Sequence, residues 1–248
     1  MIETEDAGGV RLIAFNRPEV RNAFNVAMYR AVAAAIDEAA GDGAVRAVVL
    51  TGRGSAFSAG QDLAEMAEMA ASRSPARAGS GFPRLLDSLQ RCPKPLFAAV
   101  NGVGVGLGFT MLGHCDIVLI DEGARLRAPF AELGVPPEAA SSYLFPARMG
   151  WQRAAQVLLC SEWLTAPEAV DIGIALRVCP SGTVVDEALA LATRVAAYPS
   201  EAVQEIKALM RATQDDAVRD ARRREDEAFG RLLGGAAARA ALDGWRTT

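Results

Sequence analysis

The sequence predicts an α/β fold, in which the strands of a mainly parallel sheet alternate with crossover helices. The first observation is that residues 45–51 and 96–100 form short, mostly apolar runs of strand length, as strands buried on both faces do. The second is that segments with the helical spacing of apolar residues lie between such runs. Because 51% of the 248 residues are hydrophobic, the chain can bury one large core.

Local signals support the individual elements of the first half. Asn25 is a good N-cap for a helix whose apolar positions continue to about residue 40. Pro93 and Pro95 end a second helix before the next buried strand. Residues 71–81, rich in Ser, Ala, Arg and Gly, are expected to form a mobile connection. In chain order, we expect strands at 10–16, 45–51, 96–100 and 116–120, and helices at 25–40 and 82–89.

Helices dominate the chain from Glu138 onward. No repeat period and no convincing linker divides the sequence. We therefore expect a core over residues 1–195 and a C-terminal helical region over residues 196–248 that belongs to the same fold unit. The helix boundaries are indicated by the capping box Thr165-Ala-Pro-Glu168, by Gly173, by Ser200 and by Gly234-Gly235.

The charge pattern argues against nucleic acid as a partner. The formal net charge is −4, so the chain lacks the basic surface that neutralises phosphates. The cluster Arg222-Arg223-Arg224 is followed at once by three acidic residues, which predicts a solvated helix face. The N-terminal residues are acidic and polar, and no apolar run is long enough for a membrane span. We expect a soluble, cytoplasmic protein without a membrane partner.

The cysteines and the single histidine give little support to a metal site. The four cysteines are far apart without a C-x-x-C pair, so we expect reduced, mostly buried thiols and no bound metal. A hydrolase of the triad type would depend on His114 alone. A packed or surface role is the better interpretation of that histidine.

Two glycine-containing segments, residues 52–63 and 101–109, follow predicted buried strands. The alternate glycines of the second segment allow main-chain N–H groups to approach a ligand closely. Their spacing is G-x-G-x-G, which does not match the dinucleotide motif G-x-G-x-x-G, and no phosphate-loop lysine follows. The alternative is that these glycines only allow a helix to pack closely on a strand.

Four blocks of sequence occur in an order that resembles the crotonase (enoyl-CoA hydratase/isomerase) superfamily. They are FNRPEVRNAFN, VVLTGRGSAFSAGQDL, PLFAAVNGVGVGLGFTMLGHCDIVL and LTAPEAVDIGIALRV. The resemblance covers most of the chain. It implies a spiral of repeated β-β-α units, a helical C-terminal region that forms trimers, and an acyl-CoA thioester as ligand. The expected assembly is a homotrimer or a hexamer, and no separate cofactor is expected because coenzyme A is part of the substrate.

By the same resemblance, the two glycine segments supply an oxyanion hole. The donors would be the main-chain N–H groups of Gln61 and Leu107, and Leu107 would also begin a helix whose dipole adds to the effect. One such donor is typically worth ~3 kcal/mol in transition-state stabilisation. The residues implied to bind coenzyme A or substrate are Ala23, Ala59, Gly60, Gln61, Asp62, Leu63 and Leu107.

Glu138 is the candidate proton carrier. The hydratases of the superfamily use two glutamates, and the matching positions here are Thr110 and Phe130, neither of which can act as a general base. The segment around Glu138 resembles the single-acid enoyl-CoA isomerases, which carry an acid at this position. Its prolines and small apolar neighbours would partly desolvate the carboxylate. Spacing alone favours the alternative, an exposed acid in the first turn of a helix, stabilised by the helix dipole. The family resemblance and the two hydratase positions without an acid reverse that order.

The resemblance thus implies an isomerase that converts 3-enoyl-CoA to 2-enoyl-CoA, with Glu138 as acid and base. One alternative is a hydratase, or another thioester reaction, that uses an unidentified carboxylate. Another is a crotonase-fold protein that binds acyl-CoA without catalysis. Glu132, Asp62, Asp116 and Glu122 are expected to have structural roles, in loops or as caps.

Overall fold

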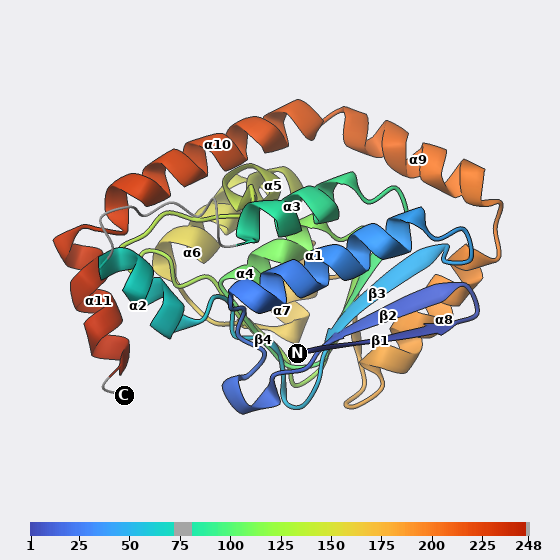
Figure 1. Ribbon diagram of the computed structural model, residues 1–248, viewed down its shortest axis with the longest axis horizontal. Helices are drawn as coiled ribbons and strands as arrows, with labels where there is room; N and C mark the ends of the chain where they lie inside the picture. Colours follow the sequence, from blue (N-terminus) through green and yellow to red (C-terminus); the bar gives the residue numbers. More distant parts are fainter. Residues whose placement is uncertain (72–80, 247–248) are drawn as a thin grey trace.

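Two sheets with helices wound around them make up the structure, a computed structural model that describes residues 1–71 and 81–246 (Figure 1). Most of the predicted connection at residues 71–81 therefore lies outside the described residues. The larger sheet has the order β1 (Ile2–Ala7), β2 (Val10–Phe15), β3 (Ala47–Gly52), β5 (Leu96–Val100), β7 (Ile117–Asp121) and β10 (Arg177–Cys179). The smaller sheet has the order β4 (Ala56–Ser58), β6 (Val103–Val105), β8 (Arg125–Arg127) and β9 (Leu164–Thr165).

The chain winds between the sheets as a spiral. Three successive turns each give one strand to the larger sheet and the next strand to the smaller one, in the pairs β3 and β4, β5 and β6, and β7 and β8. Within each sheet these strands pair in parallel. The expected β-β-α spiral is thus confirmed. Strand β1, antiparallel to β2 at the sheet edge, was not predicted because its residues are polar and mostly exposed.

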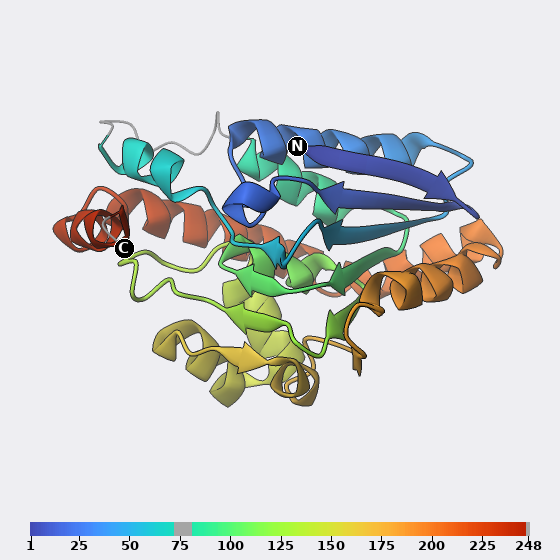
Figure 2. The same cartoon turned by 90° about the horizontal axis from the view of Figure 1, so that it is seen from below.

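Helices cover both faces of the larger sheet (Figure 2). Val48 and Leu50 of β3 pack toward α1 (Val26–Gly41) and α3 (Phe82–Arg91), whereas Val49 packs toward α8 (Val184–Ala196). Alternation of this kind, with both sets buried, explains the continuous apolar run that predicted the strand. The remaining helical elements of the core are η1 (Pro18–Val20), α2 (Leu63–Ala71), α4 (Leu107–Thr110), η3 (Met111–His114), α5 (Ser141–Met149), α6 (Trp151–Cys160) and α7 (Ala166–Asp171).

Three C-terminal helices fold back over this core. They are α9 (Ser200–Ala212), α10 (Asp215–Leu232) and α11 (Ala236–Arg246). In Figure 1, α9 and α10 run across the top of the molecule and α11 turns down beside α2, with which it is in contact. Helix α10 packs on α5. The chain therefore brings α10 next to the segment that contains Glu138.

Several local predictions are confirmed. The side chain of Asn25 accepts from the N–H of Met28 at 2.9 Å and caps α1. The capping box at Thr165 and Glu168 is formed in both directions, and α7 is followed by Gly173 with φ 79°. Of the four cysteines, Cys160 alone is exposed, and all four are free thiols.

No helix within the described ranges has both the length and the apolar character that crossing a bilayer requires.

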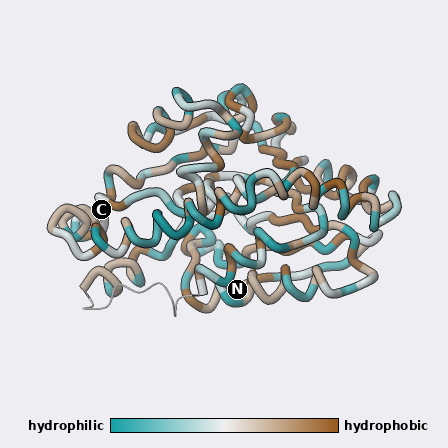
Figure 3. The backbone as a smooth tube through the Cα atoms, turned by 90° about the horizontal axis from the view of Figure 1, so that it is seen from above, coloured by the Kyte–Doolittle hydropathy of each residue, from teal (hydrophilic) through white to brown (hydrophobic). Residues whose placement is uncertain are grey.

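The prediction of a solvated face at Arg222–Glu227 is wrong for two of its residues. Helix α10 is largely hydrophilic in Figure 3, yet Glu225 is only 6% exposed. Arg222 forms an ion pair with Asp87 of α3 at 2.8 Å. The helical period explains both, because these residues lie on the same side of α10 as the buried Val218.

Candidate active site

The two glycine-containing turns lie directly against each other. They follow β4 and β6, which pair in parallel, so both turns leave the smaller sheet at the same edge. Gly60 has φ 86°, and a Cβ added there would lie 2.5 Å from the oxygen of Val105 and 3.3 Å from the nitrogen of Leu107. Only glycine permits this approach, which brings the main chain before Gln61 next to the main chain of the second turn.

The main-chain N–H of Leu107 is at the start of a helix. Gly106, with φ 53°, precedes α4, and the first N–H groups of a helix have no acceptor within it. The same helix end carries the positive pole of the peptide dipoles. Gln61 and Leu107 line one pocket. Two segments that are far apart in the sequence thus present their residues to the same space.

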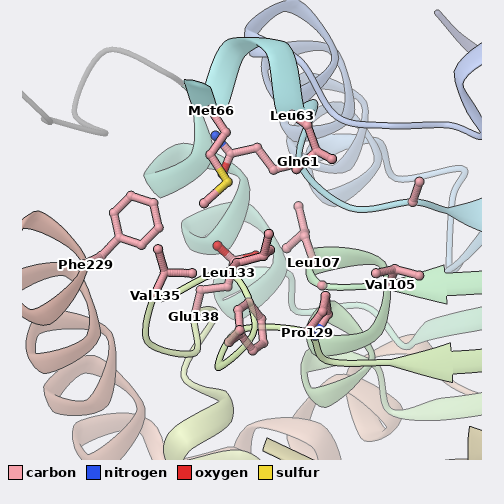
Figure 4. Close-up of a pocket in the computed structure, with 13 residues that line it drawn as sticks. Gln61, Leu63, Met66, Val105, Leu107, Pro129, Leu133, Val135, Glu138 and Phe229 are labelled. Atoms are coloured by element: carbon pink, nitrogen blue, oxygen red, sulfur yellow. The ribbon is translucent and has the colours of Figure 1, made fainter. Parts of the chain in front are cut away.

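Glu138 lies in this pocket. Its residue is only 4% exposed, and Figure 4 shows its side chain pointing into the space that Met66 and Leu63 close from the opposite side. The alternative of an exposed first-turn acid is therefore wrong. The other lining residues are mainly apolar and are Ala59, Gln61, Val105, Gly106, Leu107, Pro129, Phe130, Leu133, Val135 and Phe229.

The positions that match the two hydratase glutamates carry no acid in the pocket. Phe130 lines the pocket with its apolar ring. Thr110 is fully buried, and its hydroxyl has no hydrogen-bond partner among the described atoms. Within residues 1–71 and 81–246, Glu138 contributes the one carboxylate that lines this pocket. Among the described residues, Glu138 is thus the single carboxylic acid available in the pocket to carry a proton.

A second hollow opens beside the first and shares Ala59, Gln61, Leu63 and Val105 with it. The residues predicted to bind coenzyme A gather around these two spaces. Ala23 and Asp62 line the second hollow, Leu107 lines the first, and the buried Gly60 lies between the two turns.

Arg127 and Trp163 are among the residues of the second hollow that were not predicted from the sequence. The guanidinium of Arg127 lies 5.4 Å from the centre of the Trp163 ring, close enough for a cation–π contact. They come from strand β8 and from the turn before β9, far apart in the sequence. No motif in the sequence indicates that they meet.

The remaining candidate residues make structural contacts. Nε2 of His114 lies 2.8 Å from the main-chain oxygen of Ala139, and burial lowers the pKa of His114 to about 4, so its ring is neutral near pH 7. Of the packed or surface role expected for His114, the structure shows the packed one. The four acids with expected structural roles pair as follows: Asp62 with Arg17 at 3.4 Å, Asp116 with Lys207 at 2.7 Å, Glu132 with Arg127 at 2.6 Å, and Glu122 with the N–H of Ser181 at 3.2 Å.

Helix α10 contributes two further residues that sequence reasoning missed. Phe229 lines the pocket, and Glu225, one helical turn earlier, is buried behind the segment that follows Glu138. Their spacing from Val218 is the signal that could have indicated them. No group of three or more metal-binding side chains is present in the part of the chain that the structure describes.

Comparison with known proteins agrees with this geometry. The chain is 35% identical over 222 residues to 2,3-dehydroadipyl-CoA hydratase of Escherichia coli strain K12, which covers 89% of this chain and 85% of that protein. It is 35% identical over 212 residues to enoyl-CoA delta isomerase 2 of Rattus norvegicus, which covers 84% of this chain. That alignment covers 54% of the rat protein, so the chain spans about half the length of this relative.

Solved structures show the same fold. The structure of Pseudomonas aeruginosa OdaA superposes with a TM-score of 0.94 at 34% sequence identity and covers 100% of this chain and 99% of that one. An enoyl-CoA hydratase/isomerase from Pseudoalteromonas atlantica T6c gives a TM-score of 0.92 at 33% identity, with 99% of this chain and 96% of that chain covered. Residues 5–245 also match the model of one family, and the chain therefore belongs to the enoyl-CoA hydratase/isomerase (crotonase) family.

Proposed function

We propose that the protein moves the double bond of an enoyl-CoA thioester from the 3-position to the 2-position. Glu138 takes a proton from the α carbon, and the electron pair of that C–H bond spreads into a dienolate with negative charge on the thioester oxygen. The N–H groups of Gln61 and Leu107 stabilise this oxyanion. The carboxyl of Glu138 then returns the proton to the γ carbon, so no water is consumed or released.

The proposal rests on one observation: a buried acid and two main-chain segments line the same pocket. Glu138 is 4% exposed and shares the pocket with Gln61 and Leu107. The walls are mainly apolar, and a pocket of this type excludes the water that would exchange with the carried proton. A 1,3-proton transfer needs one carrier, and the pocket offers one carboxylate within the described residues.

Hydration is the second candidate, because a hydratase is among the relatives. In the two-acid route of the family, a second carboxylate shares the attacking water with the first. Thr110 and Phe130 stand at the matching positions, and a hydroxyl and a phenyl ring cannot replace both proton transfers. Binding of acyl-CoA without catalysis is the third candidate, and the same two substitutions favour it.

Substitution of Glu138 tests the proposal. We expect Glu138→Gln to lower turnover of a 3-enoyl-CoA by about 10²-fold or more, because general acid–base catalysis typically contributes that much. Glu122→Gln is the control, since Glu122 is remote from the pocket and bonds the N–H of Ser181. Unchanged turnover in Glu138→Gln would refute the assignment. Efficient hydration of a 2-enoyl-CoA favours the hydratase, and binding without deuterium exchange at the α carbon favours the binding protein.

A further inference from the structure

The peptide unit between Ala139 and Ala140, directly after Glu138, has both of its polar groups bonded to side chains from distant parts of the sequence. Its carbonyl oxygen accepts from Nε2 of His114 at 2.8 Å. Its N–H, on Ala140, donates to Oε2 of Glu225 at 2.7 Å. A carbonyl oxygen can only accept, so Nε2 of His114 carries the proton in this contact. We call these two side chains and the peptide that they hold the peptide clamp.

The clamp stabilises an unusual bend of the main chain. Ala139 and Ala140 have φ 59° and 58°, a left-handed conformation that two successive non-glycine residues rarely adopt. Such a bend persists when its surroundings hold it. The second carboxylate oxygen of Glu225 accepts from the N–H of Ser142 at 2.9 Å, so one side chain holds both the middle of the bend and the main chain that follows it. The bend fixes the direction in which the preceding residue, Glu138, projects its side chain.

The two clamp residues come from elements that themselves form the pocket. His114 ends η3, the continuation of α4, and α4 begins at Leu107. Glu225 lies on α10 one turn before Phe229, which lines the pocket. The clamp therefore connects the turn that contains Glu138 to the helix that begins with an oxyanion donor and to one wall of the pocket.

We propose that His114 and Glu225 are positioning residues, which hold the Ala139–Ala140 peptide so that the carboxylate of Glu138 is aimed at the bound thioester. The inference rests on the proposed function, because it needs Glu138 to be the proton carrier. An apolar residue in place of Glu225 would pack on the buried stripe of α10 without the cost of burying a carboxylate. Burial raises the pKa of Glu225 to about 7, in keeping with that cost. Compared with an apolar residue at this position, the carboxylate of Glu225 contributes the two hydrogen bonds to the main chain.

Glu225→Gln and two substitutions of His114 test the clamp. Glutamine at 225 keeps one acceptor but turns an NH₂ group toward the other main-chain donor. We expect kcat for a 3-enoyl-CoA to fall about 10-fold to 100-fold with KM within about twofold, since small misplacements of a catalytic group have effects of this size. His114→Phe is expected to act in the same direction. His114→Gln, which can still donate to Ala139, is expected to recover most of kcat.

Asp121→Asn is the matched control. Asp121 is 7% exposed, and its two oxygens accept from the N–H groups of Gly123 at 2.9 Å and Gly182 at 2.8 Å, away from the pocket. Asp121→Asn replaces one of these two acceptors with a donor, as Glu225→Gln does. Both variants should therefore lower the melting temperature, but Asp121→Asn should leave kcat unchanged. If Glu225→Gln folds poorly, the comparison of His114→Phe with His114→Gln provides the same test.

Glu138→Gln, measured in parallel, separates two kinds of failure. If Glu138→Gln is inactive while the Glu225 and His114 variants keep the kcat of Asp121→Asn, the clamp is refuted and the proposed function stands. If Glu138→Gln retains turnover, the role of Glu138 is refuted and the clamp with it.

Discussion

The shifted pKa values of Glu225 and His114 should make the free energy of unfolding depend on pH in opposite directions. Burial of its carboxyl is the main cause that raises the pKa of Glu225 from 4.5 to about 7. Hydrogen bonds from the side chain of Ser142 and from the N–H groups of Ser142 and Ala140 oppose the rise, and the charge of Glu138 adds to it. The folded state therefore binds this proton more tightly than the unfolded state. The resulting stabilisation is complete below about pH 4.5 and is lost as the pH rises through about 7.

His114 behaves in the reverse manner. Burial lowers its pKa from 6.5 to about 4, the bond to Ala139 opposes this, and the nearby Arg222, Arg148 and Arg211 lower it further. Its stabilising contribution is complete above about pH 6.5 and is lost as the pH falls through about 4. One pKa unit is worth about 1.4 kcal/mol, so each residue changes the free energy of unfolding by about 3 kcal/mol across its own range. Between about pH 4.5 and 6.5 the two effects nearly cancel.

Single substitutions should reveal how each residue changes the free energy of unfolding with pH. Relative to the wild type, Glu225→Gln should gain stability as the pH rises from about 4.5 to 7, because the falling contribution of Glu225 is gone. His114→Gln should lose stability relative to the wild type as the pH rises from about 4 to 6.5. The assay is urea unfolding at half-unit pH intervals, with the m-value checked for constancy. The double variant should restore a curve nearly parallel to that of the wild type. If all four curves run parallel, the reasoning about these two buried groups is wrong.

Two further predictions concern the main chain of the pocket and the second hollow. Gly60→Ala should destabilise the protein by about 2–4 kcal/mol in urea unfolding, because φ 86° and the 2.5 Å approach to Val105 both oppose a Cβ. Gly150→Ala, with φ 76° and ψ 163° but open space around the added atom, should cost about 1–3 kcal/mol from its backbone conformation alone and less than Gly60→Ala, and equal losses would contradict the close approach of the turns. Trp163→Ala should raise KM for an acyl-CoA about 3-fold to 10-fold with little change in kcat, as expected when binding contacts alone are lost. Trp151→Ala, at a residue 75% exposed and outside both spaces, should not change KM, and a similar rise there would count against the second hollow as a binding surface.

The strands that could be predicted are those whose own residues are continuously apolar. Strands β3 and β5 are buried on both faces and have continuous apolar runs. Strands β4, β6 and β8 have three residues each, too few for a periodic pattern, and β6 lies within the alternating glycines. The smaller sheet, which sets the two turns side by side, therefore could be expected only through the family resemblance.

The candidate site divides in the same way. The burial of Glu138 could be expected only with the family resemblance, because its prolines and small neighbours are equally typical of an exposed first turn of a helix. For Glu225 the helical spacing from Val218 indicates the buried side of α10, but the main-chain donors that bind its carboxylate come from residues more than 80 positions earlier in the chain and could not be predicted. A run of mixed charges predicts a solvated helix face wherever the tertiary contacts are unknown.

The chemistry of the pocket explains why positioning should fall to residues outside the recognised motifs. Main-chain N–H groups are fixed by the path of the chain, so the turns at Gln61 and Leu107 need no particular side chain to aim them. A glutamate has rotatable side-chain bonds, and in the proposed reaction the carboxyl of Glu138 must reach two carbon atoms of the same substrate. Its direction depends on the peptide that follows it, which His114 and Glu225 hold from opposite sides. A change at either residue should therefore reduce proton transfer more strongly than substrate binding, whereas a change in the glycine turns should reduce the stability of the fold as well.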